Sequence, residues 1–255
     1  EQLYHQAFHA ILAIGEPALE PLENAFYKSG ISDKELIRVT RAIAGIKSGE
    51  KIPILSGKLD HYNISVVKEA LKGLMKEGYH VMGNDMTRLT GMLKRIVEIT
   101  ARNFSLLVSI RNELPQSQLV IALEEEYKED MDLIFSFLSL AYDHESVYYI
   151  RQNYESGTTE GIGYAVELLD MLIDETIKPF LFPLFEDNSD YDKIKNLQIE
   201  FPVEIQKLPD ALYTILSSDM NQLGEYTRVL ALRELMKYNN LKITQSIVAQ
   251  AFHPS

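Results

Sequence analysis

A five-residue pattern recurs along the chain: alanine, a branched aliphatic residue, two free positions and a second aliphatic residue. It begins at Ala10, Ala42, Ala70, Ala165 and Ala231, so that successive alanines lie 32, 28, 95 and 66 residues apart. The last two gaps are close to three and two times 32. A period of about 30 to 35 residues in a helix-rich chain is typical of stacked helical hairpins. The pattern therefore predicts an all-α fold, an α-α superhelix built as a helical-repeat solenoid.

Helix start and stop signals divide the first 78 residues into hairpins of the same layout. Glycine followed by proline ends one helix and begins the next at both 15–17 and 49–53. Ser32 with Glu35 three residues later predicts a capped helix start, and Asn63 or Ser65 is expected to cap the helix that ends near Gly78. Strands are disfavoured because apolar residues do not alternate with period two in this stretch.

The remaining residues predict further helices with a less regular layout. We expect a long helix over 84–111, about 40 Å at 1.5 Å per residue. Further helices are expected over 115–141, bent or broken around Glu129-Asp130, and then over 142–153, 164–173, 177–185, 205–217, 223–238 and 243–252. Residues 199–205 are the only stretch that we expect to be extended. We treat 1–255 as a single solenoid, with 1–78 its clearest hairpins and 79–255 degenerate repeats.

Composition limits the classes of partner. The formal net charge of −12 repels phosphate backbones, so we expect no nucleic-acid partner. The longest apolar runs, 133–142 and 180–185, are too short to cross a bilayer, so no membrane span is expected. The absence of cysteine excludes disulfides and thiolate metal sites. The chain begins with glutamate and shows no signal-peptide pattern, and we therefore expect a fragment of a longer protein.

Two stretches resemble known families. Residues 15–22 (GEPALEPL) and 33–46 resemble HEAT repeats of the short bacterial type, with Arg38 and Arg41 where such repeats often carry a basic residue. Residues 138–143 (LSLAYD), 164–170 (YAVELLD) and 178–185 (KPFLFPLF) are similar to the soluble helical region that follows the membrane part of bacterial proteins related to ATP/ADP translocases. This second resemblance implies a cytoplasmic location and attachment to a transporter-like membrane protein, with transport implied only for that parent protein.

Several polar groups in the sequence are candidates for metal binding or catalysis. His5 and His9, one helical turn apart, can bind a metal with Glu1, although surface histidines near a terminus are much commoner. Asp143-His144-Glu145 and the pair Glu167 and Asp170 offer carboxylates for acid–base work, but they fit helix caps or structural acids better. Gly161-Ile162-Gly163 lacks the third glycine and the preceding strand of a nucleotide-binding loop. We expect no enzyme, no cofactor and no metal.

Basic residues concentrate in the predicted long helix. Its only interior acids are Asp85 and Glu98, whereas the whole chain is acidic. Such a helix can dock an acidic partner, an adjoining domain or lipid head groups, or it can pair internally with the acidic residues at 124–126 and 129–130. We assign four of its basic residues, without Arg111, as candidate partner-binding residues: Arg88, Lys94, Arg95 and Arg102.

The sequence therefore favours a non-enzymatic scaffold for protein–protein or interdomain interaction. Its expected partner is a protein segment or an adjoining domain of the same polypeptide, bound on the inner face of the solenoid. The adjacent Tyr148 and Tyr149 are either interface anchors or the amphipathic edge of the core. The alternative is a metabolite- or nucleotide-sensing module, or an enzyme, with a pocket beside the 84–111 helix.

Overall fold

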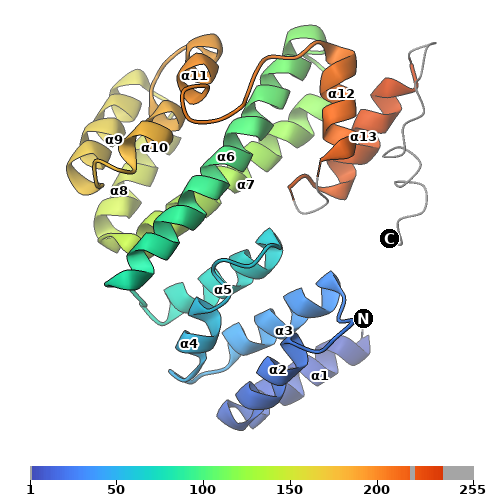
Figure 1. The fold of residues 1–255 in the computed structure, drawn as a ribbon, viewed down its shortest axis with the longest axis vertical. Helices are drawn as coiled ribbons and strands as arrows, with labels where there is room; N and C mark the ends of the chain where they lie inside the picture. Colours follow the sequence, from blue (N-terminus) through green and yellow to red (C-terminus); the bar gives the residue numbers. More distant parts are fainter. Residues whose placement is uncertain (1, 219–221, 238–255) are drawn as a thin grey trace. The chain divides into compact units, whose positions relative to one another are not determined.

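The computed structural model of the chain describes residues 2–218 and 222–237. Within these residues the fold is all-α, because they form helices joined by turns and loops and contain no β-strand (Figure 1). None of the described helices combines the length and the apolar character needed to cross a bilayer. The contacts divide the chain into two compact units, residues 1–92 with 136–144 and residues 93–135 with 145–255.

Short helices form the first unit, with α3 at its centre. In chain order they are α1 (Gln2–Ile14), the 3-10 turn η1 (Glu16–Ala18), α2 (Leu19–Phe26), α3 (Asp33–Gly45), α4 (Lys51–Ser56) and α5 (Ile64–Lys76). Helix α3 packs against α1, α2, α4 and α5, and its longest contact is with α5 (Figure 1). Helices α3 and α5 each follow a shorter helix, α2 and α4, so the two hairpins have the same order of helices.

The predicted caps of the first unit are confirmed. The Ser32 hydroxyl accepts a hydrogen bond from the Glu35 N–H, and the Glu35 carboxylate accepts one from the Ser32 N–H at 2.9 Å. The Asn63 side chain accepts a hydrogen bond from the Ser65 N–H at 2.9 Å, so Asn63 is the cap of α5. Gly78, beyond the end of α5, adopts a positive φ of 62°, which few other residues tolerate.

Two long helices contribute residues to both units. These are α6 (Asn84–Glu113) and α7 (Gln118–Ala141), and α6 is about 45 Å long at 1.5 Å per residue. They pack together in the second unit, where the rings of Phe104 and Tyr127 lie 5.2 Å apart. The chain continues through α8 (His144–Glu155), α9 (Thr159–Leu172), α10 (Lys178–Phe185), α11 (Asp190–Leu197), α12 (Leu208–Ser217) and α13 (Glu225–Leu235).

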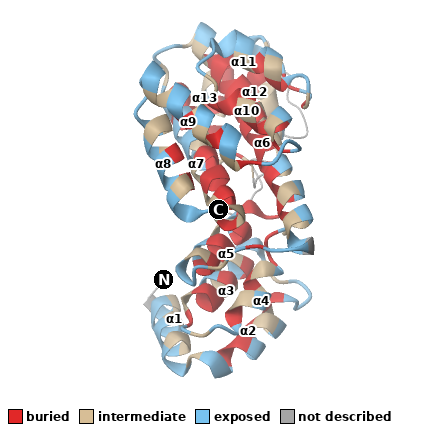
Figure 2. Ribbon diagram, turned by 90° about the vertical axis from the view of Figure 1, so that its left-hand side faces the viewer, coloured by how far each residue is buried: buried red, intermediate tan, exposed pale blue. Residues whose placement is uncertain are grey.

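Apolar side chains fill the interior of each unit. Figure 2 shows the buried residues on the inward sides of the helices and the exposed ones on the outer sides. Phe26, Leu36 and Val66 form a buried cluster in the first unit. In the second unit the Phe185 ring lies 5.5 Å from Phe135 and 5.0 Å from Tyr154, and α10 packs against both α9 and α11.

Three predicted features differ from the structure. Helix α7 passes through Glu129-Asp130 without a break, because the buried Asp130 carboxylate accepts a hydrogen bond from the Asn103 Nδ2 at 2.8 Å. Residues 190–197, which we did not predict as helical, form α11 behind a cap at Ser189. The predicted helix at 205–217 begins only at Leu208; the preceding residues run along α6, where the Gln206 N–H donates to the Ser109 Oγ at 2.9 Å.

Other boundaries agree with the prediction to within a few residues, except that α9 begins five residues early, at Thr159 behind the Thr158 cap. Residues 199–205 contain no helix and no strand, so they are an irregular connection. The predicted helix at 243–252 lies outside the described residues.

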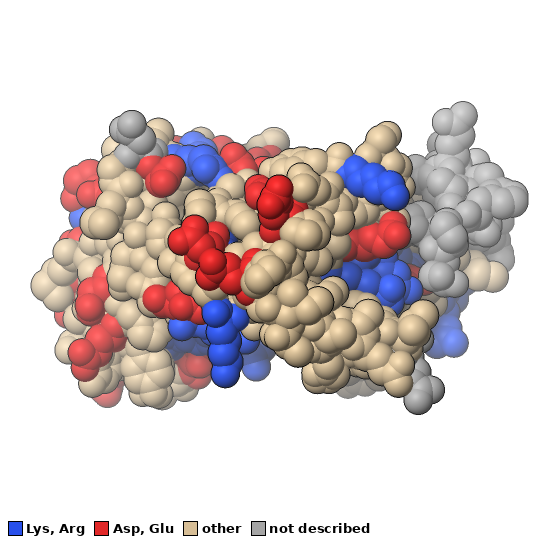
Figure 3. Space-filling model, turned by 90° about the horizontal axis from the view of Figure 1, so that it is seen from below, with Lys and Arg blue, Asp and Glu red and all other residues tan. Residues whose placement is uncertain are grey.

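Acidic and basic side chains are intermixed over the face drawn in Figure 3.

Candidate functional site

Helix α1 differs in solvent exposure from the other helices that carry the recurring alanine pattern. The alanine and the aliphatic residue four positions later are at most 3% exposed in α3, α5, α9 and α13. In α1 the corresponding Ala10 is exposed and Ile14 is 59% exposed. Because the same positions form the packing face in four helices, their exposure in α1 marks a packing face that the described residues leave uncovered.

Helix α1 has apolar residues on two sides. Tyr4, Phe8 and Leu12 are partly buried and turn toward α3, where a Cβ placed on Gly45 would lie 2.8 Å from the Leu12 Cδ2. Leu3, Ala7, Ala10 and Ile14 follow one another at spacings of four, three and four residues, which places them on a second, exposed stripe. We call these four residues the α1 stripe.

No charged side chain interrupts the α1 stripe. Helix α1 contains neither lysine, arginine, aspartate nor glutamate, and its exposed polar groups are the flanking residues His5, Gln6 and His9. A helix that faced water on this side would be expected to carry charges there. The composition of α1 is therefore that of a helix packed on both sides.

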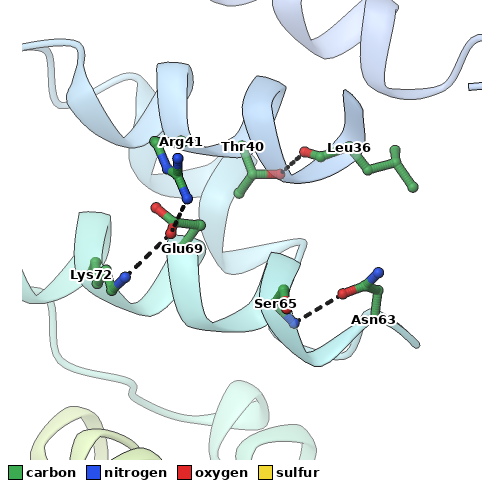
Figure 4. A network of polar contacts seen from close by, with 7 residues as sticks. All are labelled: Leu36, Thr40, Arg41, Asn63, Ser65, Glu69 and Lys72. Atoms are coloured by element: carbon green, nitrogen blue, oxygen red, sulfur yellow. Dashed lines mark hydrogen bonds and ion pairs between the residues drawn. The ribbon is translucent and has the colours of Figure 1, made fainter. Parts of the chain in front are cut away.

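Polar contacts join the second helices of successive hairpins in the first unit (Figure 4). Arg41 on α3 pairs with Glu69 on α5 at 3.1 Å, and Lys72 pairs with the same carboxylate at 3.2 Å. Burial alone would raise the pKa of Glu69, but the hydrogen bonds from Arg41 and Lys72 outweigh it and lower that pKa. The Arg38 guanidinium lies over the Tyr4 ring of α1, 4.4 Å from its centre.

The structure gives internal partners to the predicted partner-binding residues of α6. Arg88 pairs with Asp60 at 3.0 Å, Lys94 with Glu200 at 2.8 Å and Arg102 with Glu98 at 3.2 Å. Arg95 also has an interaction partner. An acidic ligand would therefore have to compete with these pairs, and the assignment of Arg88, Lys94, Arg95 and Arg102 stays a prediction.

Arg111 behaves partly as the internal-pairing interpretation predicted. Its guanidinium lies 3.6 Å from Glu124, in the expected acidic stretch, and 2.9 Å from Asp190 on α11. Glu126, two residues further along α7, has a different role. Glu126 accepts hydrogen bonds from the Gly224 N–H and the Thr227 hydroxyl, and so anchors the start of α13.

The remaining polar groups are dispersed. His5 and His9 are exposed on α1, and Asp143, His144 and Glu145 lie at the start of α8. Asp170 pairs with Lys178 at 2.9 Å, while Glu167 is exposed. Across residues 2–218 and 222–237, histidine, aspartate and glutamate form no group of three that can hold a metal ion.

The predicted alternative requires a pocket beside the long helix α6. A cavity lined in part by Asp85, Arg88 and Leu89 of that helix has a volume of about 10 Å³. That is about the space of one water molecule. It cannot hold a metabolite or a nucleotide, whose pockets are usually about 300–1,000 Å³.

Comparisons with known proteins find no match, whether with protein-family models, with curated proteins or with solved structures. The site must therefore be interpreted from its own geometry. The α1 stripe is not among the sites predicted from the sequence, although the repeated pattern and the absence of charges in α1 both indicate an apolar packing face. What the sequence could not provide was the contrast in exposure among the five occurrences of the pattern.

Proposed function

We propose that this chain is a non-enzymatic helical-repeat scaffold whose hairpins stack into a superhelix, and that the α1 stripe receives another helix. One observation carries the proposal: the repeated alanine and aliphatic positions are buried in four helices and exposed in α1. In a stacked array each repeat buries the apolar face of its neighbour, and a terminal repeat without a polar outer face needs a partner.

The proposed occupant is a helix with an apolar stripe, supplied by an adjoining domain of the same polypeptide. Helix α2 packs against α3 in this manner, and we expect the added helix to pack against α1 similarly. The small side chains of Ala7 and Ala10 allow a close approach of the two helices. The cytoplasmic location and the attachment to a transporter-like membrane protein belong to the same proposal and depend only on the resemblance of residues 138–143, 164–170 and 178–185.

A tethered copy of helix α2 tests the proposal. Residues 15–31, which include η1 and α2, are fused to the N-terminus of the full chain through a flexible Gly/Ser linker. Such a linker gives an effective concentration on the order of millimolar, so a weak contact becomes measurable. We expect the fused helix to raise the free energy of unfolding in urea by about 1–2 kcal/mol, because it removes apolar area from water.

Two single substitutions provide the control. Ile14→Glu places a charge on the α1 stripe and is expected to abolish the gain, whereas His9→Glu adds the same charge on the polar side of α1 and should retain it. A tethered segment of scrambled sequence should give no gain. If the native and scrambled segments stabilise the chain equally, or if Ile14→Glu leaves the gain unchanged, the α1 stripe is not a packing surface for a helix.

A further inference from the structure

A groove between α8 and α9 lies in the second unit and shares no residue with the α1 stripe. Its volume is about 390 Å³, within the range of ligand-binding pockets. Four residues from each helix line it: Ser146, Tyr149, Ile150 and Asn153 from α8, and Tyr164, Leu168, Met171 and Leu172 from α9. Ser156, Gly157 and Thr158 connect the two helices, and the Thr158 hydroxyl caps α9 by accepting from the Gly161 N–H at 3.1 Å.

Large apolar and aromatic side chains stand exposed along this groove. Tyr149 is 51% exposed, Tyr164 is 53% exposed and Met171 is 76% exposed, while Ile150 is buried beneath them. Figure 2 shows the outer sides of α8 and α9 as exposed or partly exposed. Tyrosine and methionine are enriched at the buried centres of protein interfaces: tyrosine supplies a large, rigid contact area, and methionine adapts its shape to the partner.

Helix α9 has separate apolar faces for the core and for the groove. Ala165 and Leu169 are fully buried, and α10 packs against this helix. Tyr164, Leu168 and Met171 recur at spacings of four and three residues and line the groove instead. The groove face is therefore additional to the face that the fold requires.

The rim of the groove is acidic. Glu160 and Glu167 on α9 and Glu145 on α8 each lie one helical turn from a tyrosine that lines the groove. These three carboxylates are exposed and form no ion pair or hydrogen bond with the described residues. Helix α9 contains no lysine or arginine, and the single arginine of α8, Arg151, is committed to Asp132 and Glu155.

We propose that the groove between α8 and α9 binds a basic peptide segment that inserts an apolar side chain between Tyr149 and Tyr164 and places lysine or arginine beside Glu145, Glu160 and Glu167. Charge complementarity selects this occupant, because an acidic segment or an anionic lipid surface would meet three unpaired carboxylates. The proposal concerns α8 and α9 alone and does not depend on the stacking proposed for α1.

Fluorescence polarisation with a defined probe tests the assignment. The probe is a labelled amphipathic peptide of leucine and lysine, and its control replaces every lysine with glutamate at the same leucine spacing. We expect the basic peptide to bind the full chain and to bind more weakly as salt is added, because exposed charges are screened. Tyr164→Ala should weaken binding about tenfold or more, as at an interface hot spot, and Glu167→Lys about three- to tenfold.

Matched substitutions elsewhere separate local binding from a general attraction to an acidic protein. Tyr191→Ala removes a similarly exposed tyrosine from α11, and Glu20→Lys reverses an exposed acid on α2; neither should change the affinity. Circular dichroism establishes that each variant is folded. The proposal is overturned if both peptides bind equally, if Tyr191→Ala weakens binding as much as Tyr164→Ala, or if the basic peptide does not bind.

Self-association is a further informative outcome. Sedimentation velocity compares the unliganded chain with Met171→Glu, which introduces a charge into the groove. If the unliganded chain dimerises and Met171→Glu abolishes the dimer, the occupant is a second copy of this chain and the basic-peptide proposal is wrong. A monomer in both cases supports the proposal, provided that the peptide binds as expected.

Discussion

Arg41 and Glu69 occupy the same position relative to the recurring alanine pattern, on α3 and α5, and pair with each other at 3.1 Å. Each directly precedes the alanine of the recurring pattern, Ala42 in α3 and Ala70 in α5. The pattern therefore aligns more than the apolar faces: it brings opposite charges from neighbouring helices into register. The position equivalent to them in α1 is His9, which is exposed.

The Glu69 pair makes stability depend on pH in a defined direction. Because the pKa of Glu69 is lower in the folded protein than its ordinary value of 4.5, folding favours the ionised carboxylate. Its contribution is complete above pH 4.5 and is lost as the pH falls through the folded-state pKa. Glu69→Gln should cost about 1–2 kcal/mol of unfolding free energy at pH 7, measured by urea denaturation, and the cost should shrink in acid.

Lys72 provides the control for this prediction. Its side chain is 65% exposed, although it contacts the same carboxylate. Exposed ion pairs contribute little, so Lys72→Ala should change stability by less than about 0.5 kcal/mol. If Lys72→Ala costs as much as Glu69→Gln, the Arg41–Glu69 pair is not the dominant interaction of this carboxylate.

Local signals in the sequence predicted most helices and their caps, but not the features that depend on residues far away in the chain. The cap at Ser32 and the end at Gly78 could be predicted because both depend on residues within one turn of each other. The continuity of α7 could not, since Asp130 is satisfied by Asn103, 27 residues away on α6. The helix α11 was missed because its polar sequence, DYDKIKNL, buries only Ile194 and Leu197.

Lys51 supplies a second prediction, for the end of α3. Its buried ammonium donates to the carbonyl oxygens of Ala44 at 3.0 Å and Ile46 at 2.7 Å, and it pairs with Glu77 at 2.8 Å. A cation at a helix C-terminus satisfies carbonyls that have no partner within the helix. Lys51→Met should therefore cost about 2–4 kcal/mol in chemical denaturation.

The exposed neighbour Lys47 gives the comparison for Lys51. Lys47→Met removes the same charge and adds the same side chain four residues earlier, but Lys47 is exposed. Its replacement should change the free energy of unfolding by less than about 0.5 kcal/mol. Equal losses for the two variants would contradict a capping role for Lys51.

The buried contact between Asn103 and Asp130 leads to a third prediction, in which the loss of stability again decreases in acid but has carboxylate repulsion as its cause. Asn103→Asp places a second carboxylate next to Asp130, where the native Nδ2 lies 2.8 Å away. Both residues are buried, so their repulsion should cost about 2–4 kcal/mol at pH 7. The loss should decrease as the pH is lowered, because one carboxyl can then hold a proton.

An exposed asparagine distinguishes this effect from the chemistry of the substitution. Asn24→Asp on α2 makes the same change at an exposed position and should be nearly neutral between acid and neutral pH. Urea denaturation of both variants over the same pH range provides the measurement. A loss for Asn103→Asp that does not vary with pH would exclude carboxylate repulsion as its cause.

The proposed groove on α8 and α9 and the basic residues of α6 illustrate what a sequence leaves undetermined. The carboxylates and tyrosines of α8 and α9 are visible in the sequence, but their convergence requires knowing that both helices line one groove. The basic residues of α6 show the converse, because their clustering predicts a docking surface. In the structure Arg88 and Lys94 pair with acids that are distant in the sequence, and Arg102 pairs with an acid one helical turn away. Charge patterns within one helix do not identify the acids that neighbouring elements bring.

The final prediction compares alanine substitutions at Gly73 and Gly91. The comparison distinguishes the effect of helix propensity from the effect of helix packing. Alanine is favoured over glycine inside a helix by about 1 kcal/mol. At Gly73 on α5, however, an added Cβ would lie 2.8 Å from the Ala44 Cβ and 3.1 Å from the Ala44 Cα, on the backbone of α3. Relieving that contact requires the helices to separate, so Gly73→Ala should destabilise the protein by about 1–3 kcal/mol.

At Gly91 on α6, nothing lies within 4 Å of an added Cβ, and the residue is exposed. Gly91→Ala should therefore stabilise the chain by about 0.5–1 kcal/mol, since only the propensity operates there. Thermal and urea denaturation of the two variants should move in opposite directions. If Gly73→Ala is stabilising as well, α5 does not approach α3 closely enough for glycine to be required, and the tight packing of these two helices is refuted.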